Sequence, residues 1–202
     1  MLDAETKTKR DAGILQGQRI MVLGACCSFG RSMVRALVAS GAQVVAVDAN
    51  ADGLKQLAGA VPLTLKGTPE EGLRRVGRAW GEARLDAVLN LMPLRHPSAV
   101  DLNIAALQGI VQGFMPALSA REGQIVTVVV RPDQALDVGA GAMAMGPALV
   151  SAQSAFAHAL RRDGLTLNIV NVGEGAVKPA HKAVVGLLAK SLGAITGSEL
   201  RL

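Results

Sequence analysis

Residues 19–48 read RIMVLGACCSFGRSMVRALVASGAQVVAVD, and this stretch decides the fold of the chain. An apolar run at 19–24 leads into a short turn that contains glycine, and a helical stretch follows at 30–40. A second Val-rich run then occupies 42–48. Strand, turn, helix and strand in this order predict two parallel strands that are joined by a right-handed crossover.

The same alternation continues to the end of the sequence. Further strands are expected at 60–65, 85–91, 123–130, 165–170 and 199–202, and further helices at 51–59, 68–84, 98–118, 147–162 and 181–192. The sequence therefore predicts an α/β Rossmann-type doubly wound parallel sheet of about seven strands, with helices on both faces. We expect a polar leader at 1–16 and one domain at 17–202.

The composition fits a protein with a large core and no covalent cross-links. Half of the residues are hydrophobic, and the only two cysteines, Cys26 and Cys27, are adjacent. Adjacent cysteines rarely form a disulfide without strain, so a reducing compartment is expected. Because they precede a helix, they could have a lowered thiol pKa and a redox role, but a role as small packing residues is favoured. The leader has no apolar segment and no run is long enough to cross a bilayer, so we expect a cytoplasmic protein.

The charge of the chain is moderately basic, with a formal net charge of +5. Arg74, Arg75 and Arg78 would share one helix, and such a stripe could attract nucleic acid. A solvated helix face is favoured instead, because acidic residues accompany the arginines and aromatic stacking residues make up only 2% of the chain. We therefore expect no nucleic-acid partner.

The turn between the first strand and its helix is the candidate nucleotide site. It runs from Gly24 to Gly30, and such a turn lets the backbone approach a pyrophosphate at the helix N-terminus. Asp48 ends the second strand, where a carboxylate can accept hydrogen bonds from an adenosine ribose and would repel a 2′-phosphate. The pattern predicts that NAD, if a dinucleotide binds, is preferred over NADP.

Beyond this turn, the chain resembles the short-chain dehydrogenases/reductases from end to end. Their turn is TGxxxGxG, and Leu23, Gly24, Ser28 and Gly30 stand at those positions. The segment LDAVLN at 85–90 is similar to the strand before the family's NNAG, and Leu91-Met92-Pro93 replaces its last three residues. LTLNIVNVG at 165–173 resembles VNxVxPG, and AITGSELRL at 194–202 resembles the closing iTGxxlxvdGG.

The resemblance implies a dinucleotide site. Its cofactor-binding residues would be Gly24, Ser28, Phe29, Gly30, Asp48 and Asn90. Two departures affect it: Ser28 replaces the second glycine, and Thr64 stands where the family usually has an aspartate near the adenine. NAD binding and an empty cleft both remain open.

The resemblance also implies a catalytic set that this chain lacks. The family reduces carbonyls with a tyrosine acid, a lysine, a serine and a helix asparagine, and this chain contains no tyrosine. Val130 stands at the serine position, and the lysine position falls near Gly146 or Gln153. Asn103, at the position of the helix asparagine, is the one member retained. The sequence thus predicts a pseudoenzyme that serves as a structural or regulatory subunit.

A divergent oxidoreductase is the alternative to a pseudoenzyme. His96 follows the fourth strand, at the end of the sheet where such folds bind ligands, and with Arg95 and Lys178 it could form an improvised acid site. A loop histidine without a catalytic role is favoured, because no oriented partner is visible in the sequence. His158 and His181 read as isolated, and no metal site is expected.

Two helices, at 99–118 and 143–160, are apolar on nearly every face. A helix of this kind must be buried on every face, whereas a sheet covers only one side. The family pairs these helices across a dimer. We therefore expect a homodimer or a larger oligomer through them, or a different partner protein on the same surface. The small residues expected to permit close helix approach are Gly109, Ala148, Ser151, Ala152 and Ala155.

Overall fold

The computed structural model describes residues 13–132, 139–173, 176–191, 193 and 195–202. Of the leader expected at 1–16, residues 1–12 lie outside the described ranges. Leu15, by contrast, is fully buried in the core, and its backbone N–H donates to the carbonyl of Ser40 at 3.0 Å. The ordered packing therefore includes a residue that we had assigned to the leader.

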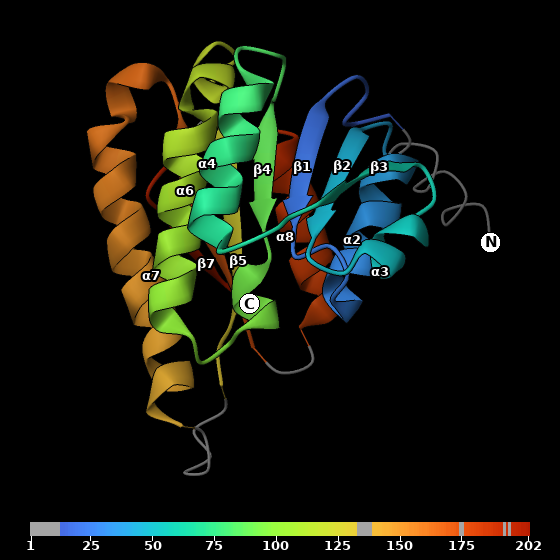
Figure 1. The fold of residues 1–202 in the computed structure, drawn as a ribbon. Coiled ribbons are helices and arrows are strands. Elements are labelled where there is room, and N and C mark those ends of the chain that lie inside the picture. The colour runs from blue at the N-terminus through green and yellow to red at the C-terminus, as the bar shows by residue number, and fades with distance from the viewer. Residues whose placement is uncertain (1–12, 133–138, 174–175, 192, 194) are drawn as a thin grey trace, which may run out of the picture.

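A seven-stranded parallel sheet forms the centre of the molecule (Figure 1). The strands are β1 Arg19–Leu23, β2 Gln43–Asp48, β3 Ala60–Thr64, β4 Ala87–Asn90, β5 Gln124–Val130, β6 Thr166–Val172 and β7 Glu199–Arg201. Their order is β3-β2-β1-β4-β5-β6-β7, and every neighbouring pair is parallel. The predicted fold class is confirmed. The order reverses between β1 and β4, so a crevice is expected outside the carboxyl ends of these two strands.

Helices cover both faces of the sheet. They are α2 Ser28–Ala39, α3 Ala51–Lys55, α4 Pro69–Trp80, α5 Met92–Arg95, α6 Val100–Ser119, α7 Ala140–Ala159 and α8 Val177–Leu188, with a 3-10 turn at Arg161–Asp163. Helices α2, α3 and α8 lie on one face, and α4, α6 and α7 on the other (Figure 1). Each face has its own apolar core, with Val22, Val34 and Val184 in one and Met21, Ile110 and Leu149 in the other.

Two helices begin earlier than predicted. Helix α7 begins at Ala140, and Pro147, which we had taken as its first residue, lies inside it. The buried side chain of Met145 anchors this first part of α7 to the core. Helix α8 begins at Val177 rather than at 181. In the described ranges, none of the helices has the length and apolar character needed to cross a membrane.

Part of helix α6 is covered by α4 of the same chain, which corrects the prediction that Gly109 permits the close approach of a partner helix. A Cβ on Gly109 would lie 3.0 Å from Glu70 Cα, and one on Gly113 would lie 2.8 Å from the Leu73 carbonyl oxygen. The glycines of α6 therefore allow the close approach of α4 and not of a second molecule. On α7 the outer face does remain exposed, and it carries Met143, Ser151 and Ala155.

Candidate functional site

The turn after β1 requires glycine at both of its ends. Gly24 has a φ of +77°, and a Cβ there would lie 3.0 Å from the carbonyl oxygen of Leu91. A Cβ on Gly30 would lie 2.7 Å from the carbonyl oxygen of Ala25. The glycines thus allow α2 to begin directly above the end of β1. This is the geometry in which helix N–H groups face a phosphate.

The N-terminus of α2 is capped by a thiol. Cys27 Sγ accepts a hydrogen bond from the Gly30 N–H at 3.2 Å, while Ser28 lies exposed at the first position of the helix. Burial raises the pKa of the Cys27 thiol and of the Cys26 thiol, and the Asp48 carboxylate raises the pKa of Cys26 further. Both shifts oppose thiolate formation, so the local environment does not activate these cysteines.

Asp48 is buried beneath the turn and is bound by the protein itself. Its Oδ2 accepts the Cys26 N–H at 2.9 Å, and its Oδ1 accepts the Asn50 N–H at 3.0 Å. The guanidinium of Arg95 lies 3.5 Å from Oδ1. Sequence reasoning placed Asp48 at the ribose but did not foresee these partners. The Asp48 carboxylate therefore stabilises the turn after β1 through these hydrogen bonds, and it also faces the crevice.

A hollow of about 200 Å³ adjoins Asp48 at the carboxyl end of the sheet. Leu65 and Leu102 contribute apolar walls, and Arg95 and His96 line it too. The structure thus brings together three residues that the sequence analysis had assigned to two different sites. Lys178, the third member of the improvised acid site, is not among the lining residues.

The two asparagines support backbone rather than facing a substrate. Asn90 Oδ1 accepts the Met92 N–H at 3.1 Å and so fixes the start of α5. Asn103 Nδ2 donates to the carbonyl oxygens of His96 at 2.8 Å and Ala99 at 2.9 Å. Both side chains are fully buried. Asn103 therefore holds the segment that carries His96.

The position of the family's catalytic serine lies beside a second hollow, of about 360 Å³, at the carboxyl ends of β5 to β7. Val130 is half exposed there, and Gly146 lines the same space. Asn171 Nδ2 donates to Glu199 at 2.6 Å, and a hydrogen bond from Arg201 lowers the pKa of Glu199. Gln153, the other candidate for the lysine position, is fully buried in α7.

His181 is not isolated, contrary to the sequence analysis. Its ring stacks on Phe29 with centroids 4.6 Å apart, and its Nε2 lies 2.8 Å from Ser32 Oγ. Burial lowers the pKa of this imidazole. Phe29 therefore directs its side chain to α8. No group of three or more His, Cys, Asp or Glu side chains in the described ranges could hold a metal ion.

Comparisons with known proteins identify the fold. Neither a scan against protein-family models nor a search of the curated proteins finds a match. Among solved structures, a Burkholderia xenovorans protein described as a short-chain dehydrogenase/reductase is 18% identical, with a TM-score of 0.77 over 95% of this chain and 97% of that chain. The Pseudomonas aeruginosa protein RhlG, in an active-site complex with NADP, is 16% identical, with a TM-score of 0.78 and the same coverage of both chains.

A third solved structure agrees with these two. The citronellol catabolism dehydrogenase AtuB of Pseudomonas aeruginosa is 19% identical to this chain, and its TM-score is 0.78. The likeness covers 94% of this chain and 95% of that one. The chain therefore has the fold of the short-chain dehydrogenases/reductases.

Proposed function

We propose that this chain, which has the fold of the short-chain dehydrogenases/reductases, binds NAD and does not catalyse carbonyl reduction. It would act as a structural or regulatory subunit. The observation that carries this proposal is the complete absence of tyrosine from a sequence with that fold. Without a phenol group, the chain has no side chain of the type that donates the proton in the family's reaction.

The turn between β1 and α2 supports nucleotide binding. Gly24 and Gly30 leave room that a Cβ would fill, and the first N–H groups of α2 can receive a phosphate. Asp48 lies at the end of β2, where a ribose would be placed, and Asn90 lies at the end of neighbouring β4. RhlG, which shares this fold, has been solved with NADP. When bound, NAD would supply a hydride acceptor.

The residues at the positions of the family's catalytic set support the proposal that the chain does not reduce carbonyls. Val130 presents an apolar side chain where the resemblance places the serine, and Gly146 has no side chain. Asn103 is retained, but both hydrogen atoms of its amide are used by backbone carbonyls. Because Asn103 has this structural role, its presence in the sequence does not imply that the chain is catalytic.

A subunit role is supported by the outer face of α7. This helix of 20 residues contains no Asp, Glu, Lys or Arg, and Met143 on its surface is 48% exposed. Burial of this face against a second copy would remove apolar area from water. We therefore propose a homodimer through α7 and the exposed edge of α6. A reducing compartment such as the cytoplasm suits the two free thiols.

A divergent oxidoreductase is the second candidate, and one observation favours it. Arg95 and His96 line the same hollow as Asp48, so a charged group and an imidazole do lie beside the crevice. The side chain of His96 is exposed, however, and its described contacts are made by its backbone. An unoriented imidazole is a poor general acid.

The nucleotide part of the proposal is tested by thermal unfolding with and without NAD. A ligand that binds only the folded state at 100 times its Kd stabilises that state by about 2.7 kcal/mol, so the melting temperature should rise. Ser28→Glu should abolish the rise, because a carboxylate at the exposed start of α2 repels pyrophosphate. Ser28→Gln has the same size without the charge and should keep it. An unchanged melting temperature of the wild type at millimolar NAD would refute NAD binding.

A further inference from the structure

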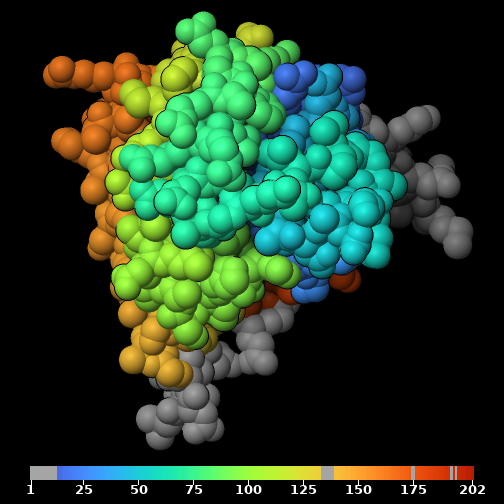
Figure 2. Space-filling model, in the orientation of Figure 1, coloured from blue at the N-terminus to red at the C-terminus, as the bar shows by residue number. Residues whose placement is uncertain are grey.

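A groove that the proposed function does not use lies between α4 and the β3 edge of the sheet. We call it the α4–β3 groove; its volume is about 700 Å³. Figure 2 shows α4 in green beside the cyan atoms of β3 on one face of the molecule. The groove is lined by Arg19, Ala42, Gln43, Val44, Val45, Gly59, Val61, Pro62, Leu63, Val76, Ala79 and Trp80. Because Arg19 and Gln43 begin their strands, it reaches the end of the sheet opposite to the nucleotide turn.

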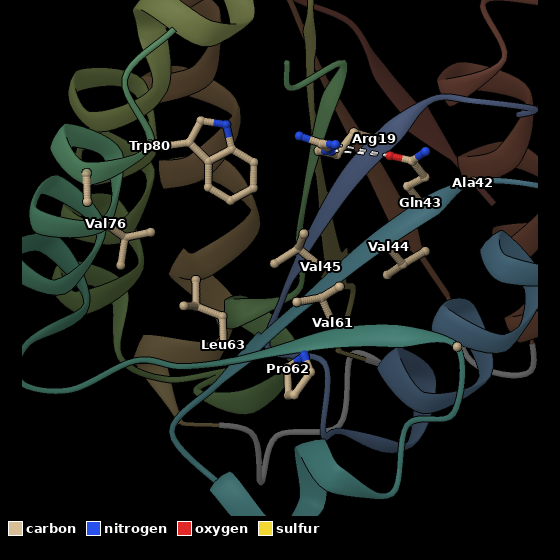
Figure 3. A pocket seen from close by; sticks show the side chains of 12 residues that line it. Arg19, Ala42, Gln43, Val44, Val45, Val61, Pro62, Leu63, Val76 and Trp80 are labelled. Atoms are coloured by element: carbon tan, nitrogen blue, oxygen red, sulfur yellow. Dashed lines mark hydrogen bonds between the residues drawn. The ribbon is translucent and has the colours of Figure 1, made fainter. Parts of the chain in front are cut away.

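The groove leaves one face of the sheet partly open beside its edge strand, although Val45 within it is buried. Trp80 and Val76 of α4 face the side chains of Val45 and Leu63 across the groove (Figure 3). Val61, beside them on β3, is 63% exposed. Parallel sheets are usually covered on both faces, so a partly open apolar groove beside the edge strand is a candidate binding surface.

One end of the groove is polar and positively charged. Arg19 donates from Nη2 to Gln43 Oε1 at 3.2 Å, and this pair lies at the far end of the apolar lining in Figure 3. Arg19 takes part in no ion pair within the described ranges. The neighbouring carboxylate of Asp86 accepts the Arg19 backbone N–H and is paired with Arg84 at 2.8 Å. The side-chain charge of Arg19 therefore has no protein counter-ion here.

The indole of Trp80 is fixed at this end of the groove. Its Nε1 donates to the carbonyl of Ala83 at 2.9 Å, and its ring meets Phe114 edge to face with centroids 5.9 Å apart. The N–H is satisfied, so what the ring offers to the groove is apolar contact. Trp80 is also the single tryptophan of the sequence.

The edge strand itself is not suited to pairing with another strand. Pro62 lies in the middle of β3 and has no N–H to donate, and proline is characteristic of sheet edges that avoid pairing. The binding surface is thus the side-chain groove rather than the backbone of β3. An occupant needs an apolar body and a single anionic end.

We propose that the α4–β3 groove binds a medium-chain organic carboxylate. Its alkyl chain lies along Val45, Leu63 and Val76, its first methylenes pass the Trp80 indole, and its carboxylate meets Arg19 and the amide of Gln43. The apolar lining gives affinity, and the unpaired guanidinium selects an anion over a neutral or cationic amphiphile. This site is independent of nucleotide binding, since it shares no residue with the turn after β1.

The test titrates the full chain with decanoate, below its micellar concentration, and follows the fluorescence of Trp80. Decanoate should saturate the signal, whereas decanol and decylamine should bind up to about fivefold more weakly, which is the upper end for one exposed ion pair. Octanoate should bind up to about sixteenfold more weakly than decanoate, since each fully buried methylene contributes up to about fourfold in affinity.

Three variants separate the charge from the apolar lining. Arg19→Gln should bind decanoate and decanol equally, because the guanidinium is lost. Val61→Asp should abolish binding, and its exposed position keeps the fold intact. Arg78→Gln, on α4 but lining a different hollow, removes one positive charge and should leave decanoate binding unchanged.

Four results would overturn the proposal. The first is Trp80 fluorescence that does not respond to decanoate in a chain whose circular dichroism is native, and the second is equal binding of decanoate and decanol to the wild type. The third is an equal loss of decanoate binding in Arg78→Gln and Arg19→Gln. The fourth is a groove that is already covered by a second copy of the chain. Sedimentation of Val61→Asp identifies the last case, because the substitution would then give a smaller assembly than that of the wild type. The NAD-induced rise in melting temperature is expected to be the same in all three variants.

Discussion

At the residue scale, the side chain that unites the candidate site is Asp48. Its two oxygens accept hydrogen bonds from the N–H groups of Cys26 and Asn50, and these bonds stabilise the turn without any ligand. Arg95 partly balances the charge of the carboxylate from 3.5 Å. A buried carboxylate bound in this way keeps its orientation, and it lines the hollow at the carboxyl end of the sheet.

The charge of Asp48 gives a prediction about nucleotide selectivity. The wild type should bind NAD more tightly than NADP, because the carboxylate would lie against the 2′-phosphate. Asp48→Asn should reduce that preference about tenfold, which corresponds to about 1.4 kcal/mol. Isothermal titration calorimetry with both nucleotides measures the ratio. Asp52→Asn, at an exposed position of α3, removes the same charge as a control. Tighter binding of NADP to the wild type would show that this prediction is wrong.

Residues of the site differ in how far the sequence could predict them. The positions of Gly24, Gly30 and Asp48 follow from a local strand–turn–helix pattern, so they could be placed without a structure. The contact between Ser32 and His181 joins residues that are 149 positions apart, and no local sequence pattern predicts it. The Arg95 pairing with Asp48 was missed for the same reason. It depends on α5, a single helical turn between the strand and the helix that we had predicted at 85–91 and 98–118.

At the element scale, α4 packs closely on α6 through glycine. A Cβ on Gly77 would overlap the backbone of Gly113, so this contact tolerates no side chain. The sequence analysis recognised that α6 is apolar on most faces but could not show that another helix of the same chain covers it. The spacing of apolar residues indicates how many faces of a helix are buried. It does not indicate which element or molecule covers each face.

Substitution of Gly77 tests this packing. Gly77→Ala should lower the free energy of unfolding by about 2 kcal/mol, because overpacking outweighs the helix propensity that alanine adds. Gly146→Ala, in α7, is the matched control. The new Cβ there would be 3.8 Å from Asn171 Nδ2, so a gain of up to about 1 kcal/mol is expected. Urea unfolding measures both, and equal stability of the two variants would contradict the packing.

The contact between α2 and α8 should make stability depend on pH. Burial lowers the pKa of His181 below its ordinary value of 6.5, so the folded state favours the neutral ring. The stability from this residue is therefore fully present above about pH 6.5 and decreases as the pH falls through the lower folded-state pKa. His181→Gln should weaken this dependence, and His158→Gln, at an exposed position, should not. Urea midpoints at several pH values test this, and the same pH profile in His181→Gln and the wild type would contradict it.

At the scale of the whole molecule, the proposed assembly rests on the outer face of α7, a helix without Asp, Glu, Lys or Arg. Ala155 lies exposed on that face, whereas Ala152 is half buried and packs against the core. The sequence analysis treated the two alanines alike, because the phase of the helix depends on where α7 meets the sheet. The structure separates them.

This separation gives a prediction about assembly. The wild type should sediment as a dimer or larger oligomer at micromolar concentration. Ala155→Arg should give folded monomers, since the charge enters the interface without touching the core. Ala152→Arg should instead unfold at a lower temperature. Ala83→Arg, at an exposed position after α4, should leave assembly unchanged. A wild type that sediments as a stable monomer without any partner would refute the proposed interface.

The central claim is that a short-chain dehydrogenase/reductase fold is used here without that family's chemistry. The most direct test measures oxidation of NADH and NADPH by the purified chain across a panel of ketones and aldehydes. We predict rates no higher than the background without protein, because the chain has no tyrosine and has valine at position 130. Robust turnover that disappears in His96→Ala would contradict the claim and would establish a divergent oxidoreductase in its place.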